Sequence, residues 1–138
     1  MKVFSGIPRD DLGKIPDRAA WIETMGYDGI NTNEDFSSPF MALTMAAEHT
    51  CKALLGTSIA VVFPLSPMNV AYMSWELQKY SRGRFQLGMG SQVKGHIERR
   101  FSTPWVAPGP RKKEYVLSLK AIWDSYQNGT PLDFQAAL

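Results

Sequence analysis

The stretch LLGTSIAVVFPLSPMNVAYMSWELQKYSRGRFQLGMG, residues 54–90, decides the fold. It opens with an almost unbroken apolar run over residues 54–62, which is typical of a parallel strand covered on both faces. Ser66 and Pro67 then supply a hydroxyl cap and a proline at the first position of a helix. Apolar residues recur at helical spacing in that helix: Val70, Met73, Leu77 and Tyr80. A further strand is predicted over residues 85–90, so the stretch forms one strand–helix–strand unit.

The same alternation continues on both sides of this stretch. Short apolar segments predict strands over residues 2–7 and 27–32, and a last helix is expected over residues 111–128, after a polar loop at 91–110. Helical spacing predicts three inner faces: Ile15, Ala19, Ile22 and Met25; Phe40, Leu43 and Ala47; and Val116, Leu119, Trp123 and Tyr126. Four successive βα units predict a parallel sheet with right-handed crossovers. Either half of an eight-unit barrel or a small doubly wound sheet satisfies this pattern.

Composition restricts the class of protein. The 138 residues suit a single domain over 1–138, with 44% apolar and 20% charged residues, and the net charge of +2 is too small to indicate nucleic-acid binding. Cys51 is the only cysteine, which we expect to be a small buried thiol, and a reducing compartment suits it. The longest apolar stretch, residues 54–65, is shorter than a membrane span, and the chain reaches Arg9 before any long apolar run. We therefore expect a soluble cytoplasmic protein with neither nucleic-acid nor membrane partners.

In parallel α/β folds, ligands bind beyond the carboxyl ends of the strands, so the residues that follow each strand are candidates. Glu34 and Asp35 follow the second strand, where two carboxylates can act as acid and base or can simply be a solvated loop. Gly88 and Gly90 end the fourth strand. They can let the backbone approach a flat ligand or merely pack tightly, and they are not a dinucleotide fingerprint because Val93 replaces its third glycine.

The segment between residues 94 and 113 is basic. It holds six Lys or Arg residues against the single acid Glu98, and it could receive an anionic cofactor tail or be solvated surface. His96 in this segment is a candidate proton donor, although a lone histidine is more often structural. No cluster of His, Cys and Asp has the spacing of metal ligands, so no metal is expected.

A family resemblance adds to this pattern. The run from Gly56 to Phe101 resembles the luciferase-like monooxygenase superfamily, close to its F420-dependent oxidoreductases, and the most specific part is S-x-G-R-F-x-L-G-x-G at residues 81–90. The likeness continues through Trp105 and Arg111 to residues 128–134. It implies an α/β fold of four βα units, the N-terminal half of a (β/α)₈ TIM-type barrel. It also implies hydride transfer between coenzyme F420, or alternatively FMN, and an organic substrate.

The resemblance also implies roles for particular residues. Glu34 or Asp35 would stand where the family places an acidic residue beside the cofactor ring, which makes both catalytic candidates; His96 is the third, from its place in the basic segment alone. Ser58 and Ile59 match a strand end that often carries a non-prolyl cis peptide or bulge. The backbone at the end of the fourth strand would meet the ring through three residues: Gly90, Ser91 and Gln92. Phe36 stands where many relatives have a histidine close by, and Leu65 stands where close relatives often have an arginine.

A half-barrel would leave its first and fourth strands as open edges, so we expect a homo-oligomer that also binds a small-molecule substrate. The family's usual site for the cofactor phosphate belongs to the second half of the barrel, beyond these four units. Two other functions therefore remain open. The chain could be a catalytically inactive half-barrel that self-associates, or a small doubly wound binding domain.

Overall fold

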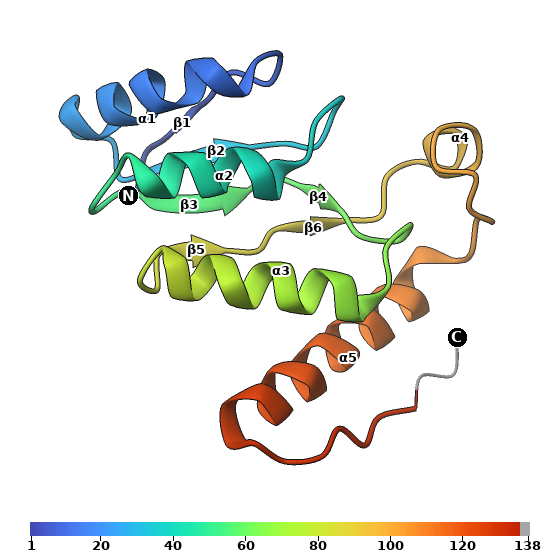
Figure 1. The fold of residues 1–138 in the computed structure, drawn as a ribbon. Helices are drawn as coiled ribbons and strands as arrows, with labels where there is room; N and C mark the ends of the chain where they lie inside the picture. Colours follow the sequence, from blue (N-terminus) through green and yellow to red (C-terminus); the bar gives the residue numbers. More distant parts are fainter. Residues whose placement is uncertain (136–138) are drawn as a thin grey trace. The chain divides into compact units, whose positions relative to one another are not determined.

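The computed structural model describes residues 1–135 and shows an α/β chain (Figure 1). The elements, in chain order, are β1 (Phe4–Gly6), a 3₁₀ turn (Leu12–Lys14), α1 (Ile15–Thr24), β2 (Gly29–Thr32), α2 (Pro39–Glu48), β3 (Leu54–Thr57), β4 (Ala60–Val61), α3 (Pro67–Tyr80), β5 (Phe85–Gln86), β6 (Met89–Gly90), α4 (Lys94–Arg99) and α5 (Pro108–Asn128). None of the helices in this part of the chain is long and apolar enough to cross a membrane.

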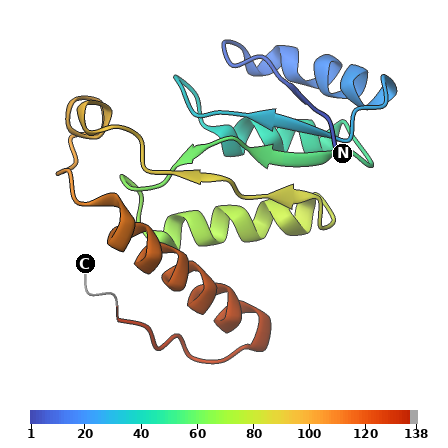
Figure 2. The same cartoon turned by 180° about the vertical axis from the view of Figure 1, so that it is seen from behind.

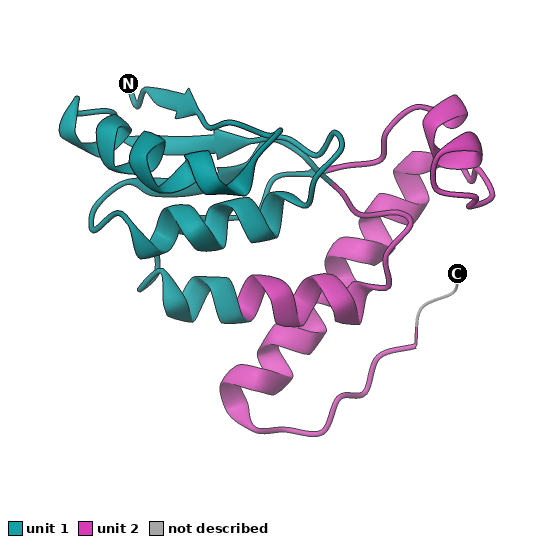
Figure 3. Ribbon diagram, turned by 45° about the horizontal axis from the view of Figure 1, so that its top comes forward, with its two compact units in different colours: residues 1–60, 76–89 teal, residues 61–75, 90–138 magenta. Residues whose placement is uncertain are grey.

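The chain divides into two compact units (Figure 3). Unit 1 comprises residues 1–60 and 76–89, and unit 2 comprises residues 61–75 and the chain from residue 90 onward. A single domain over residues 1–138 remains a prediction, and its last three residues lie outside the described part.

Unit 1 contains a parallel sheet whose strand order, β1-β2-β3-β5, follows the order of the chain. The register places Ser5 beside Ile30, Ile30 beside Leu55 and Leu55 beside Phe85. A doubly wound sheet reverses its strand order at a switch point, whereas a barrel adds each strand next to the previous one. The barrel-type prediction is therefore confirmed, and the doubly wound alternative is wrong.

Helices cover one face of this sheet. Ile30 and Leu55 are fully buried on that face, and the Phe85 ring lies 6.1 Å from the Phe40 ring of α2, centroid to centroid. Helix α2 lies in front of the sheet in Figure 1 and behind it in the reversed view of Figure 2. The predicted inner residues Ile15, Ala19 and Ile22 of α1 are fully buried, but Met25 is exposed because it follows the end of that helix.

The third and fourth predicted strands are each interrupted. Residues 54–62 form β3 and β4, and residues 85–90 form β5 and β6, with β4 and β6 in a separate two-stranded sheet. The peptide bond between Ser58 and Ile59 is cis and lies in the gap between β3 and β4. The predicted cis bond or bulge at this position is thus confirmed, while the two uninterrupted strands are not found.

Glu23, near the end of α1, fixes the loop that leads into β3. Its carboxylate accepts the backbone N–H groups of Cys51 (2.9 Å to Oε2), Lys52 (2.5 Å) and Ala53 (2.8 Å). Burial by itself raises the pKa of Glu23, but these three N–H groups outweigh it and hold the pKa below its ordinary value. Cys51 is exposed on this loop, so the expected buried thiol is wrong.

In unit 2, helix α5 packs on residues 61–75. The indole N–H of Trp123 donates to the carbonyl of Ala71 at 3.0 Å, and the Tyr126 ring lies edge-on to Trp75. The buried residues of α5 are Tyr115, Ser118, Leu119 and Ile122, so the predicted inner face was correct only at Leu119. Helix α5 begins at Pro108 and α4 occupies residues 94–99, which corrects the prediction of an unbroken loop over 91–110.

Candidate functional site

The carboxyl ends of β2 and β3 are tied together in unit 1. The Ser58 N–H donates to the carbonyl of Thr32 at 2.7 Å, and the Glu34 N–H donates to the carbonyl of Ile59 at 3.0 Å. These two bonds bring three predicted site residues, Glu34, Ser58 and Ile59, into one cluster at the strand ends. Ser58 is exposed and Ile59 is half-buried there.

Thr57 holds the next strand against this cluster. Its hydroxyl accepts the N–H of Gly88 and donates to the carbonyl of the same residue, both at 2.8 Å. The Ala60 N–H donates to the Gly88 carbonyl at 2.9 Å from the other side of the cis peptide. A Cβ at Gly88 would lie 2.1 Å from the Thr57 carbonyl oxygen, so only glycine allows this approach. The sequence pattern did not single out Thr57, because a threonine in an apolar strand is ordinary.

The sheet face opposite the helices carries a flat polar row. Gly6, Asn31, Gly56 and Gln86 are register neighbours on β1, β2, β3 and β5. A Cβ at Gly56 would lie 2.6 Å from Oδ1 of Asn31, so the asparagine amide lies across the glycine. Two glycines and two amide side chains make a shelf that can accept a flat ring with hydrogen-bonding edges. We call these four residues the shelf.

Asp35 is engaged in an ion pair. Its carboxylate accepts a hydrogen bond from Nη1 of Arg9 at 3.1 Å, and the two side chains are 40% and 43% exposed. Such an exposed pair stabilises the fold only slightly, by about 0–1 kcal/mol. Its main effect is to link the loop after β1 with the loop after β2, beside Glu34.

The other predicted residues, Gly90, Ser91, Gln92 and His96, belong to unit 2. Gln92 has a positive φ of 57°, and its side-chain Oε1 lies 3.2 Å from Nδ1 of His96. The Ser91 hydroxyl donates to the Gln92 carbonyl at 3.3 Å. The structure therefore pairs His96 with Gln92, on the exposed start of α4. Since the candidates divide between the two units, their catalytic and cofactor-binding roles remain predictions.

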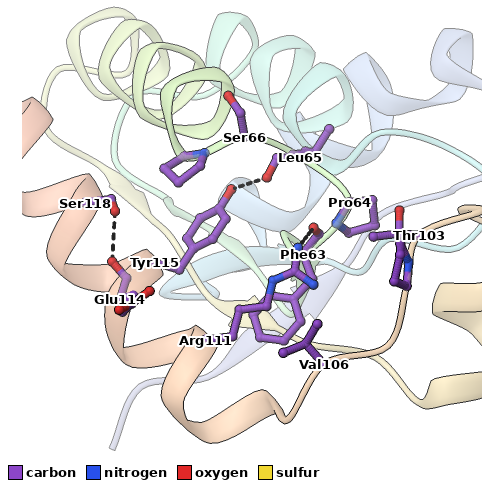
Figure 4. Close-up of a pocket in the computed structure, with 12 residues that line it drawn as sticks. Phe63, Pro64, Leu65, Ser66, Thr103, Val106, Arg111, Glu114, Tyr115 and Ser118 are labelled. Atoms are coloured by element: carbon purple, nitrogen blue, oxygen red, sulfur yellow. Dashed lines mark hydrogen bonds between the residues drawn. The ribbon is translucent and has the colours of Figure 1, made fainter. Parts of the chain in front are cut away.

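Unit 2 also contains a pocket of ≈ 480 Å³ (Figure 4). Arg111 forms one wall, where Nη2 donates to the Phe63 carbonyl at 2.9 Å and the guanidinium carbon lies 4.8 Å from the Phe63 ring centroid. The Tyr115 hydroxyl donates to the Leu65 carbonyl at 3.1 Å. Burial raises the pKa of Tyr115 well above its ordinary value, and the nearby Arg111 charge offsets this only in part, so the hydroxyl keeps its proton. Sequence reasoning missed this pocket because its walls are about fifty residues apart along the chain.

Among residues 1–135, no three His, Cys, Asp or Glu side chains gather closely enough to hold a metal ion. In the basic segment, Lys94 forms an ion pair with Glu98 at 3.8 Å, along the exposed side of α4.

Comparison with known proteins identifies similar chains. The model of the family described as luciferase-like monooxygenase matches residues 3–138. An uncharacterized protein of Mycobacterium tuberculosis is 47% identical over 135 residues, and a protein of Mycobacterium bovis matches equally well. The match covers 98% of this chain and 39% of each relative, so the chain spans about two-fifths of their length.

Solved structures share the fold. The F420-dependent tetrahydromethanopterin reductase from Methanopyrus kandleri matches with a TM-score of 0.78 and 22% identity, over 98% of this chain and 42% of that one. A type II Baeyer–Villiger monooxygenase from Pseudomonas putida, solved with FMN, matches with a TM-score of 0.82 and 16% identity, over 99% and 43%. At these identities the likeness establishes the fold, and the coverage agrees with half of a barrel.

Proposed function

The chain belongs to the luciferase-like monooxygenase family, and from this premise we propose that it forms the ring-binding part of an oxidoreductase. The reaction would be hydride transfer between coenzyme F420, or alternatively FMN, and a small organic substrate. The observation that carries the proposal is the shelf, which lies next to the hydrogen-bonded carboxyl ends of β2 and β3. A flat surface with amide groups, bordered by the exposed residue Ser58, suits a ring with polar edges.

The residues of the chain fit such a cofactor. When bound, the deazaflavin or flavin would supply the hydride chemistry itself. Asn31 and Gln86 offer amide donors and acceptors to ring edges, Gly56 lets the Asn31 amide lie flat across it, and Gly6 adds no side chain to the shelf. The backbone at Ser58 and Ile59 would support the ring from unit 1. Following the family resemblance, we also propose that the backbone of three further residues contacts the cofactor: Gly90, Ser91 and Gln92.

The protonation roles are assigned to the polar residues near the strand ends. We propose that Glu34 and Asp35 orient the ring edge and handle protons, with Arg9 holding the Asp35 carboxylate in place. His96 is the candidate proton donor of unit 2, and its ring is oriented by Gln92.

The choice of cofactor follows the likeness of residues 56–101 to F420-dependent oxidoreductases, with FMN as the alternative. One of the solved structures with this fold is an F420-dependent reductase, and another contains FMN. Both therefore belong in the same binding experiment.

We also propose that the chain self-associates in the cytoplasm. Among the described residues of unit 1, β1 pairs with β2 alone and β5 with β3 alone, so both edges of this sheet present backbone groups to a second copy. Self-association without catalysis is the competing function. It would be supported if neither cofactor binds while the oligomer persists.

The test is a fluorescence titration of the purified chain with F420 and, separately, with FMN. Gly6→Leu is the informative variant, because a Cβ there meets nothing closer than the Asn31 carbonyl oxygen at 3.9 Å and should not disturb folding. Its side chain would cover the shelf and should weaken binding by about tenfold or more. Gly109→Leu is the matched control, since a Cβ at Gly109 meets nothing within 4 Å and Gly109 lies outside the shelf. Equal binding by both variants would remove the shelf from the proposed site.

A further inference from the structure

The pocket of unit 2 contains a polar atom that the fold does not satisfy. Oε2 of Glu114 is buried and has no hydrogen-bond partner among the described residues, and Glu114 lines the pocket (Figure 4). A buried carboxylate oxygen without a donor is costly, and a ligand that supplies the donor removes that cost. We propose that this pocket binds a small organic amine, whose ammonium group hydrogen-bonds to Glu114.

The rest of the wall defines the body of the ligand. Most of the lining is apolar or aromatic: Phe63, Pro64, Leu65, Pro67, Pro104, Val106 and the Tyr115 ring. The volume of ≈ 480 Å³ falls within the range of small-molecule sites, which combine apolar walls with a few polar groups. The ligand is therefore an apolar molecule of modest size with one cationic end.

The other polar groups of the wall explain why the ligand's polar end is a donor. The hydroxyls of Thr103, Tyr115 and Ser118 already donate to backbone carbonyls of the protein. Arg111 donates to the Phe63 carbonyl and stacks on its ring, so its charge is held against that ring. The acceptor that lacks a donor is Oε2 of Glu114. An ammonium fits it better than a hydroxyl, because charge-assisted hydrogen bonds are roughly twice as strong as neutral ones.

This inference stands apart from the proposed oxidoreductase function. The residues that line the pocket include none of the shelf and none of these predicted site residues: Glu34, Asp35, Ser58, Ile59, Gly90, Ser91, Gln92 and His96. A failure to bind F420 or FMN would leave the amine site intact, and a failure to bind amines would leave the ring site intact.

Benzylamine is the probe, and benzyl alcohol is its uncharged match. With the full chain labelled with ¹⁵N, benzylamine should shift the amide signals of residues 111–118 and of Phe63 and Leu65, with a dissociation constant on the order of 1 mM. Benzyl alcohol should bind more weakly. Glu114→Gln should weaken benzylamine binding by about tenfold or more, whereas Glu76→Gln, an exposed glutamate of α3 outside the pocket, should leave it unchanged.

Thermal unfolding without ligand gives a second measurement. Glu114→Gln should keep or raise the melting temperature, because the buried oxygen at this position has no hydrogen-bond donor to lose. A clear fall in melting temperature would show that the Glu114 carboxylate is already paired in the protein and would overturn the proposal. Equal benzylamine affinity in Glu114→Gln and the parent chain, or no binding to the parent, would overturn it as well.

Discussion

Replacing Thr57 by valine tests whether one hydroxyl holds the strand ends in place. Valine keeps the shape and β-branching of threonine but lacks the oxygen that bonds both the N–H and the carbonyl of Gly88. Thr57 is only 4% exposed, so water cannot readily replace the lost partner. The substitution therefore removes two hydrogen bonds and leaves two backbone groups of Gly88 less satisfied.

The expected loss of stability follows from those two bonds. A neutral hydrogen bond contributes about 0.5–1.5 kcal/mol net, and an unsatisfied buried group costs about 1–3 kcal/mol. The Gly88 carbonyl keeps its bond from the Ala60 N–H, so the main cost is the orphaned Gly88 N–H. We expect Thr57→Val to lower the free energy of unfolding by about 2 kcal/mol.

Urea unfolding followed by circular dichroism measures this change, and Thr57→Ser is the control. Serine keeps the hydroxyl and deletes one methyl group, so it should cost only about 1 kcal/mol. The valine variant should also bind F420 or FMN more weakly than the serine variant, because the backbone around Ser58 and Ile59 would lose its anchor. If serine proved more damaging than valine, the methyl group would matter more than the hydroxyl. The idea that the Thr57 hydroxyl holds Gly88 in place would then be refuted.

Three further outcomes are expected. Glu23→Gln should lower the melting temperature at neutral pH and flatten its acid dependence: because the pKa of Glu23 is lowered by folding, its stabilisation is present above the ordinary value of 4.5 and lost as pH falls through the folded-state value. A pH profile that keeps its parent slope would contradict this. Light scattering at micromolar concentration should show a dimer or larger assembly through the β1 and β5 edges, and a well-behaved monomer would count against it. The 138-residue chain alone should bind F420 and FMN weakly, roughly a thousandfold below a site that also holds the phosphate, and submicromolar binding would disprove this.

Helical periodicity, together with the alternation of strand and helix segments along the chain, predicted most of unit 1 correctly. The buried faces of α1 and α2 follow from residues such as Ile15, Ile22 and Leu43, because spacing along a helix determines which side chains share a face. In α5 the same reasoning chose Trp123 and Tyr126, whose large rings are attractive core candidates. Both rings instead lie at the border of the buried face, with their polar ends on Ala71 and Met68.

The candidate site was only partly accessible from the sequence. Glu34, Ser58 and Ile59 could be named because they follow strands or match a family motif, and the structure brings them together. Asn31 and Gln86 were missed because their importance depends on register between strands, which periodicity within one strand does not reveal. The pocket around Glu114 was missed for a similar reason, since two distant segments form it.

The interruption of β3 and β5 shows why an apolar run alone could not reveal the site. Their pairing holds through Leu55 with Phe85 and Gly56 with Gln86 and then stops. At the next position the Thr57 side chain bonds to Gly88, so a hydroxyl replaces the backbone ladder. The backbone of Ser58 and Ile59 is then bonded to Thr32 and Glu34, on the side of β2. A run of apolar and β-branched residues predicts one continuous strand in both cases. Hydrophobicity carries no information on whether the backbone or a side chain makes the next hydrogen bond.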